Sequence, residues 1–202
     1  HSKIRELRCA FDRYERDAIA IPNSTGDLLP KLDSALNELD KLSDADQILN
    51  LIRRNEMTDL EFKEALNVCP ERRKEKKCTR PVLKTIVAFI NTEGGILLIG
   101  VNDGREITGI DEEIRRYYHG SADRYERDLT TLIENRIGKA KFEFINIRLL
   151  EVNGKRILKI SCKKSNKEPC FLDKSEFFIR PGNSTVLLEG PDVIEYRDKH
   201  FS

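Results

Sequence analysis

Three carboxylates have the residue type and placement that a divalent cation requires. Glu56 and Glu61 are five residues apart, and Asp103 stands between an apolar run of strand length and a glycine. Carboxylate oxygens gathered at a strand end are ligands that hard cations such as Mg²⁺ prefer. A cation held there can activate an attacking oxygen and stabilise a leaving oxygen on phosphorus. The three residues are therefore a candidate metal site for phosphodiester chemistry.

Each carboxylate also has an ordinary interpretation. An aspartate before a glycine is commonly part of a turn, and a glutamate on the polar face of a strand is commonly solvated. In an unbroken strand, side chains five positions apart lie on opposite faces. Glu56 and Glu61 can therefore converge only if the chain bends near residues 57–59.

The elements that must position these residues follow from apolar periodicity. Residues 59–63 alternate polar and apolar, which predicts a half-buried strand with Leu60 and Phe62 toward the core and with Glu61 and Lys63 together on the other face. A helix is expected from Thr79 to the glycines at 94 and 95. Further expected elements are strands at 96–101, 106–110, 142–152, 155–162, 177–179 and 186–188, and helices at 123–137 and from Pro191 onward.

This order of elements predicts an α+β fold with a mixed or antiparallel sheet, because strands and helices do not alternate regularly. Residues 1–54 are expected to form a small helical N-terminal segment, and residues 55–202 the main domain. The 202 residues carry 36 basic and 35 acidic side chains, and 39% are hydrophobic. This composition excludes a disordered chain, and no apolar run approaches a membrane span, so we expect a soluble cytoplasmic protein without a membrane partner.

Charge is balanced overall but locally uneven. Residues 71–80 and residues 151–168 each hold six basic and two acidic side chains, which gives each stretch a net charge of +4. Two such stretches suit a phosphate backbone. Lysine-rich loops are equally common on ordinary solvated surfaces, so composition leaves both interpretations open.

Two kinds of cofactor are not expected. Gly94, Gly95 and Gly100 lead from a helix into a strand, whereas phosphate-binding loops lead from a strand into a helix, so we expect no nucleotide cofactor. The five cysteines include no pair with two residues between them, and there are only three histidines. We therefore expect free thiols in a reducing compartment and no structural zinc.

Residues 56–63 (EMTDLEFK), 86–95 (IVAFINTEGG) and 98–103 (LIGVND) together resemble the Schlafen family, specifically its Alba-type core domain. Asn153-Gly154-Lys155, Ser165 with Pro169, and residues 178–185 (FIRPGNST) resemble the second half of that domain. The resemblance covers about residues 55–190, and the helices at the N-terminus lie outside it.

The resemblance implies an Alba-like α+β fold and a site for Mg²⁺ or Mn²⁺, because family members include endoribonucleases that cut tRNA and other structured RNA. The implied metal ligands and catalytic carboxylates are Glu56, Glu61 and Asp103, with Lys63 near the scissile phosphate. Arg180 is implied either to contact phosphate or only to brace the sheet. With the two basic stretches, the expected RNA contacts are Lys63, Arg72, Arg73, Lys74, Lys76, Lys77, Arg80, Lys155, Lys163, Lys164 and Arg180.

The sequence-based hypothesis is a metal-dependent endoribonuclease acting on tRNA or similarly folded RNA. One alternative is a non-catalytic nucleic-acid-binding module of the kind found in transcription regulators. Another is an assembly subunit that recruits a Schlafen-like partner through its N-terminal helices. Animal relatives carry two Alba-like lobes and a zinc cluster, but this chain has room for one lobe and no such cluster can be placed on it. A homodimer is therefore expected to supply the second wall of the RNA trough.

Overall fold

The structure is a computed structural model that describes residues 34, 37, 44–54, 57–66 and 79–201. The chain divides into two compact units, residues 1–44 and 45–202. Ser34, Asn37 and Asp44 are the described residues of the first unit, and all three are helical. The other predictions for residues 1–43 lie outside the described residues. None of the described helices has both the length and the apolar composition needed to span a bilayer.

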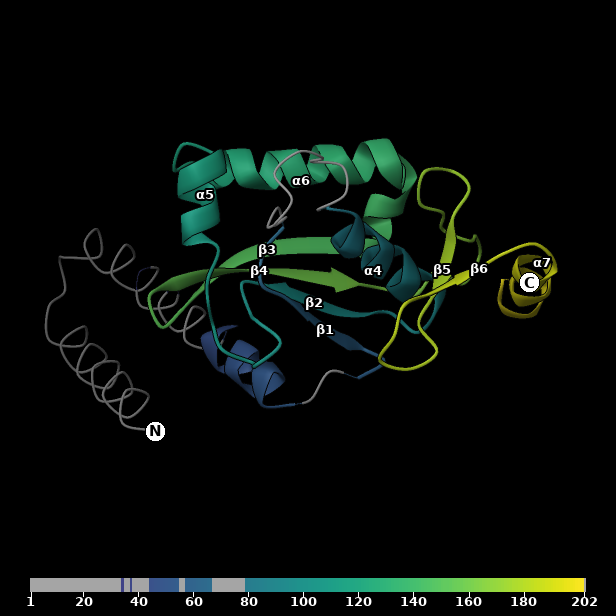
Figure 1. The fold of residues 1–202 in the computed structure, drawn as a ribbon, viewed down its shortest axis with the longest axis horizontal. Helices are drawn as coiled ribbons and strands as arrows, with labels where there is room; N and C mark the ends of the chain where they lie inside the picture. Colours follow the sequence, from purple (N-terminus) through teal and green to yellow (C-terminus); the bar gives the residue numbers. More distant parts are fainter. Residues whose placement is uncertain (1–33, 35–36, 38–43, 55–56, 67–78, 202) are drawn as a thin grey trace, which may run out of the picture. The chain divides into compact units, whose positions relative to one another are not determined.

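A mixed four-stranded sheet forms the centre of the second unit, with strand order β1-β2-β4-β3 (Figure 1). Strands β1 (Leu60–Lys63) and β2 (Gly95–Ile99) pair in parallel, and β4 (Lys155–Cys162) pairs antiparallel to both β2 and β3 (Ile145–Val152). Asn153 and Gly154 close the β3–β4 hairpin with φ values of +53° and +73°, the left-handed conformation that a tight hairpin turn requires. The predicted α+β class with a mixed sheet is confirmed.

Three helices build the core on one face of this sheet. They are α4 (Arg80–Asn91), α5 (Asp111–Tyr117) and α6 (Ala122–Arg136). Their buried side chains form one cluster with Leu97 and Ile99 of β2 and with Leu158 and Ile160 of β4. Helix α4 begins with a proline in its first turn, as predicted, and ends before Gly94, which has a φ of +79°.

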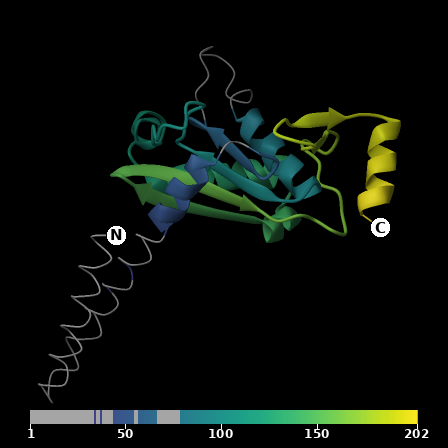
Figure 2. The same ribbon diagram turned by 90° about the horizontal axis from the view of Figure 1, so that it is seen from below.

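The opposite face of the sheet is covered in part by the helical residues 45–53 (Figures 1 and 2). Ile48 and Ile52 are buried against Leu60, Phe62 and the neighbouring apolar side chains of that face. Residues 45–54 therefore belong to the main unit, which begins ten residues earlier than the predicted boundary at 55. In the sequence, this helix is one of several predicted amphipathic helices. Only the packing in the structure shows that Ile48 and Ile52 lie against the sheet.

The C-terminal part adds a small two-stranded sheet, β5 (Phe177–Ile179) with β6 (Val186–Leu188), and the helix α7 (Pro191–His200). The buried amide of Asn91 joins this part to α4. Its nitrogen donates to the carbonyls of Cys170 and Phe178 over 2.8 and 2.9 Å, and its oxygen accepts from the Cys170 N–H over 2.7 Å. These bonds replace the water that each buried polar group would otherwise need.

Three local predictions differ from the structure. The strand expected at 142–152 begins only at Ile145, because residues 139–144 form a 3-10 helix. Residues 106–110 do not form a strand, and Ile107 makes only an isolated bridge with Val101. The short helix α5 was not predicted, because Ile114 is its only buried apolar side chain and one residue makes no periodic pattern. Among the described cysteines, Cys162 and Cys170 are free and buried. Burial raises the pKa of both thiols, that of Cys170 to about 12, so these two residues remain neutral.

Candidate nucleic-acid interface

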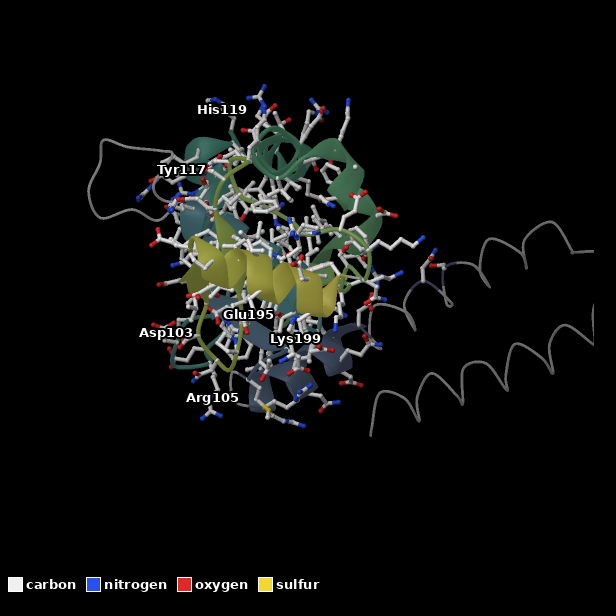
Figure 3. All side chains as sticks on the ribbon, turned by 90° about the vertical axis from the view of Figure 1, so that its right-hand side faces the viewer. Asp103, Arg105, Tyr117, His119, Glu195 and Lys199 are labelled. Atoms are coloured by element: carbon white, nitrogen blue, oxygen red, sulfur yellow. The ribbon has the colours of Figure 1, made fainter. Side chains whose placement is uncertain are left out.

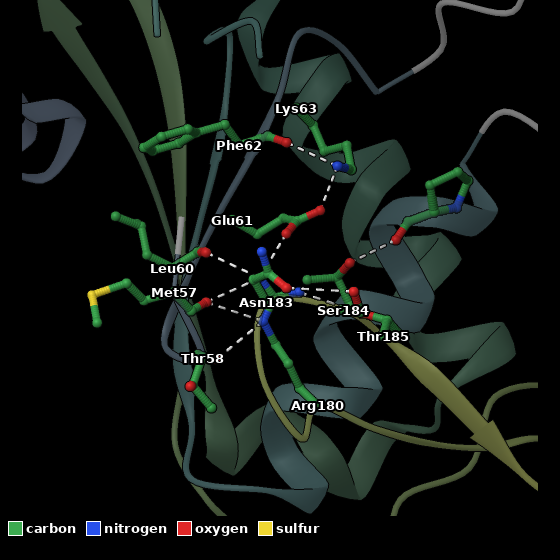
Figure 4. A network of polar contacts seen from close by, with 12 residues as sticks. Met57, Thr58, Leu60, Glu61, Phe62, Lys63, Arg180, Asn183, Ser184 and Thr185 are labelled. Carbon is green, nitrogen blue, oxygen red and sulfur yellow. Dashed lines mark hydrogen bonds and ion pairs between the residues drawn. The ribbon is translucent and has the colours of Figure 1, made fainter. Parts of the chain in front are cut away.

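Glu61 and Lys63 lie on the same face of β1, as the alternation predicts, and their side chains are joined. Lys63 Nζ donates to Glu61 Oε1 over 2.5 Å and to the Phe62 carbonyl over 2.9 Å (Figure 4). The Glu61 side chain is 12% exposed and that of Lys63 is 29% exposed. Because β1 is an edge strand, the Lys63 side chain lies at the border of the sheet.

Arg180 is buried beneath this pair. Its side chain is 1% exposed, and Nη2 donates to Glu61 Oε2 over 2.7 Å. The same nitrogen donates to the carbonyls of Met57 and Leu60 over 3.0 and 3.1 Å (Figure 4). The guanidinium lies 5.2 Å from the ring centre of Phe89. Of the two roles implied for Arg180, this arrangement matches the brace, because the group has no surface to offer a phosphate.

The chain turns sharply just before β1. Met57 and Leu60 exchange backbone hydrogen bonds of 3.3 and 3.2 Å, and residues 58 and 59 form the turn between them. This is the bend that any convergence of Glu56 and Glu61 requires. Arg180 fixes the bend from below through the Met57 carbonyl and the Thr58 carbonyl. Glu56 itself lies outside the described residues.

Asp103 is exposed on a turn that follows β2 (Figure 3). The turn is held by Asn102, whose side-chain oxygen accepts from the Glu106 N–H over 2.9 Å. The N–H groups of Gly100 and Val101 both donate to the Lys63 carbonyl, over 2.8 and 3.2 Å. The end of β1 and the start of the Asp103 turn are therefore tied together through the backbone.

The described residues do not by themselves form a metal site. They contain no group of three Asp, Glu, His or Cys side chains placed to hold an ion. Each oxygen of Glu61 already accepts from a cation, Oε1 from Lys63 and Oε2 from Arg180. A divalent cation at Glu61 would therefore share this carboxylate with two positive charges that already lie beside it.

Of the first basic stretch, residues 71–80, the structure describes only Thr79 and Arg80. Arg72, Arg73, Lys74, Lys76 and Lys77 lie outside the described residues. Arg80, at the start of α4, donates to both oxygens of Glu176 over 2.5 and 2.8 Å. These hydrogen bonds raise the pKa of Arg80 above its usual value. Arg80 therefore already has a carboxylate partner within the domain, which weakens the expectation that it contacts RNA.

The second basic stretch is a strand only as far as Cys162, where β4 ends, and Lys163 and Lys164 follow it. Its side chains therefore do not form one continuous group. Lys164 pairs with Glu93 over 2.8 Å, and Lys155 Nζ donates to the Ile107 carbonyl over 2.8 Å. Lys163 is exposed. The register of β3 and β4 places Arg148 directly opposite Lys159. Neither residue was among the expected RNA contacts. The turn at Asn153-Gly154 could have revealed this pair, because a two-residue turn sets the register of the whole hairpin.

The family model described as Schlafen, AlbA_2 matches residues 56–189. This chain belongs to the Schlafen AlbA_2 family. The matched range runs from the turn before β1 to the end of β6, so it includes Glu61, Lys63, Asp103 and Arg180. The resemblance drawn from the sequence is thereby confirmed.

Two solved structures are similar to this Schlafen-type chain. The DIP2311 protein from Corynebacterium diphtheriae is 18% identical with a TM-score of 0.49, and the match covers 82% of this chain and 29% of that protein. The N-terminal domain of a putative ATP-dependent DNA helicase RecG-related protein from Nitrosomonas europaea is 22% identical with a TM-score of 0.40, and the match covers 60% of this chain and 72% of that domain. This chain thus spans less than a third of the length of the first of these proteins.

Proposed function

We propose that this chain binds the phosphate backbone of folded RNA, such as tRNA, at the border of β1. The observation that carries the proposal is the position of Lys63. Glu61 and the Phe62 carbonyl hold its ammonium in one place, at an edge strand, with 29% of the side chain exposed. A positioned cation at an accessible edge suits a phosphate, and phosphate contacts position a nucleic acid without reading its sequence.

The finer form of the proposal is endoribonuclease activity that depends on Mg²⁺ or Mn²⁺ at Glu56, Glu61 and Asp103. Membership of the Schlafen AlbA_2 family and the acidic residue at each of the three positions support it. The turn at 57–60, at the start of β1, and the backbone tie between Lys63 and the Asp103 turn, at its end, also support it, because each brings a segment that bears one of these residues to β1. A bound cation would supply a Lewis acid for phosphodiester cleavage.

One observation favours a second candidate, a binding module without catalysis. Each oxygen of Glu61 already accepts from a cationic side chain of the same chain, so the charge of this carboxylate is balanced without any metal. In that case Glu61 orients Lys63 toward the ligand and takes no part in a reaction. The alternative of an assembly subunit, the homodimer and the cytoplasmic location stay predictions.

The deciding experiment pairs a binding assay with a cleavage assay on the full chain. Purified tRNA is incubated with Mg²⁺, Mn²⁺ or EDTA and separated on a denaturing gel, and affinity is measured by fluorescence anisotropy in EDTA. If Glu61 holds a catalytic metal, Glu61→Gln should abolish cleavage and keep or raise affinity, because a negative charge near phosphate is removed. If Glu61 only orients Lys63, the variant should lower affinity. Glu195→Gln, at an exposed position of α7, is the matched control and should change neither.

Each outcome separates the two forms of the proposal. If the wild-type chain binds tRNA but leaves it intact with both metals, the endoribonuclease is excluded and the binding module stands. If Glu61→Gln cuts at the wild-type rate, the carboxylate site is not catalytic. If the wild-type chain does not bind tRNA at all, the whole proposal is wrong.

A further inference from the structure

Three consecutive residues at the junction of α5 and α6 alternate between solvent and core. Tyr117 is 52% exposed and His119 is exposed, whereas Tyr118 between them is buried. Tyr118 packs edge-on against Tyr125 of α6, with the two ring centres 5.0 Å apart. Because the buried ring anchors the junction, Tyr117 and His119 are held on its outer side (Figure 3). We name Tyr117 and His119 the outer ring pair.

The backbone of His119 has a conformation that glycine adopts more easily. Its φ is +53°, and Gly120 follows with a φ of +79°. Helix α5 ends at Tyr117 and is capped by Tyr118, so His119 stands directly after the cap. A left-handed residue at that position is usually glycine, because a Cβ is unfavourable there. The stability of the turn therefore does not account for a histidine at this position.

The surroundings of the outer ring pair are charged and not apolar. Arg115 and Arg116 are exposed, and both pair with one carboxylate, Glu112, over 2.6 and 3.5 Å. Among the described residues, Tyr117 is the only exposed large apolar side chain on α5 or α6. A protein–protein interface has a contiguous apolar centre, which this surface lacks. Tyrosine and histidine rings near arginines are instead groups on which proteins stack unpaired nucleotide bases.

A buried hydrogen bond ties this junction to the segment that follows Lys63. The N–H of Leu66, three residues beyond Lys63, donates to Glu113 Oε2 over 3.1 Å. Three residues span at most about 11 Å, and Tyr117 lies one helical turn, about 6 Å, beyond Glu113. An RNA whose backbone contacts Lys63 can therefore reach the outer ring pair.

We infer that the outer ring pair binds an unpaired nucleotide base by stacking. The inference rests on the proposed function and deepens it by naming the class of substrate, an RNA in which an unpaired segment adjoins a helix. Bases inside a duplex are already stacked on each other, whereas bases in loops, bulges and ends can be splayed out onto a protein ring. Every base has an aromatic face, so the contact selects unpaired RNA without reading its sequence.

The test uses two RNA duplexes with the same stem, one blunt and one with a single-stranded 3′ overhang, and it measures affinity by fluorescence anisotropy. The wild-type chain should bind the overhang duplex more tightly. Tyr117→Ser should weaken binding of that duplex by about fivefold or more, as expected for the loss of one base–aromatic stack, and should leave the blunt duplex unaffected. Its slope of log K against log salt should equal that of the wild-type chain, because no phosphate contact is lost. Tyr117→Phe keeps the ring and should restore the affinity, and Glu195→Gln on α7 is the control.

Two further measurements separate a contact with a base from a structural role. His119→Gly removes the second ring and gives the φ of +53° to the residue type that adopts it freely. This variant should keep or raise Tm while it binds the overhang duplex more weakly. With 2-aminopurine in the overhang, the wild-type chain should quench the fluorescence by stacking, and Tyr117→Ser should not.

The outcomes distinguish this inference from the proposed function. If the wild-type chain binds tRNA but does not prefer the overhang duplex, or if Tyr117→Ser and His119→Gly keep the wild-type affinity for it, the inference is wrong while the proposed function stands. An equal loss of affinity for both duplexes in Tyr117→Ser would also overturn it, as would a change in the mass of the particle by light scattering, which would assign the ring to a protein contact. If the wild-type chain binds neither the duplexes nor tRNA, the proposed function fails and this inference fails with it.

Discussion

Arg180 Nη2 and Glu61 Oε2 are 2.7 Å apart across a separation of 119 residues in the sequence. The guanidinium is almost wholly buried, and the bond joins the segment after β5 to the edge strand β1. The same arginine holds the carbonyls of Met57, Thr58 and Leu60. One side chain thus sets the position of the candidate carboxylate and the shape of the turn that precedes it.

Replacement of Arg180 by Met should therefore destabilise the domain strongly. Loss of one partner from a buried ion pair typically costs about 3 to 5 kcal/mol, and here several carbonyls also lose their donor. The free energy of unfolding is measured by urea denaturation, with Arg197→Met as the control, because Arg197 pairs with Asp198 on the exposed side of α7. A loss below about 1 kcal/mol would show that Arg180 is not a brace.

The metal hypothesis makes a prediction that depends on Lys63. Its ammonium lies beside Glu61 Oε1 and would repel a divalent cation there, so Lys63→Met should strengthen binding of such a cation at Glu61. If Glu61 is a ligand, Mn²⁺ should raise Tm more in Lys63→Met than in the wild-type chain, and not at all in Glu61→Gln. A site with a Kd of about 1 mM gains about 1.4 kcal/mol at 10 mM Mn²⁺. Identical melting curves for all three proteins with and without Mn²⁺ would count against a metal site at Glu61.

Asp111 should make stability depend on pH. Burial alone would raise the pKa of this carboxyl, but the hydrogen bonds from the Arg156 N–H and side chain, at 2.9 and 2.6 Å, outweigh burial together and lower it below the usual 3.8. A depressed pKa in the folded state stabilises the fold above the unfolded pKa, and this contribution is lost as the pH falls through the folded value. Asp111→Asn should therefore lower Tm at pH 7, and the difference from wild type should shrink below about pH 4. A difference that stays constant from pH 7 to pH 2 would contradict this account.

The expected homodimer can be tested against exposed apolar side chains. Val186 and Leu187 of the edge strand β6 are each 39% exposed, and Ile194 of α7 is 55% exposed. If these residues form the contact, light scattering at micromolar concentration should give twice the monomer mass of 23.3 kDa. Leu187→Lys should then return the mass to that of the monomer, because a buried unpaired charge opposes association. A wild-type chain of monomer mass that still binds RNA would make the dimer unnecessary.

Local patterns in the sequence were sufficient for several elements near the site. Alternation over residues 59–63 placed Glu61 and Lys63 on one face of β1, and Pro81 marked the start of α4. The Asn153-Gly154 turn located the β3–β4 hairpin. Each of these signals depends on residues a few positions apart, so the chain carries them without any tertiary context. The Schlafen resemblance likewise rests on short ordered segments, and the family match confirms it.

The sequence by itself therefore determined the α+β class, the family, the side of β1 that bears the candidate site, and the turn that sets the hairpin register. Only the tertiary structure decided the rest. It showed that Arg180 pairs with Glu61, that Arg80 forms an ion pair with Glu176, and that residues 45–53 pack on the sheet. The physical reason is that these contacts join segments far apart in the chain, and which buried charge meets which partner depends on how the elements pack. No local pattern of residues encodes that choice.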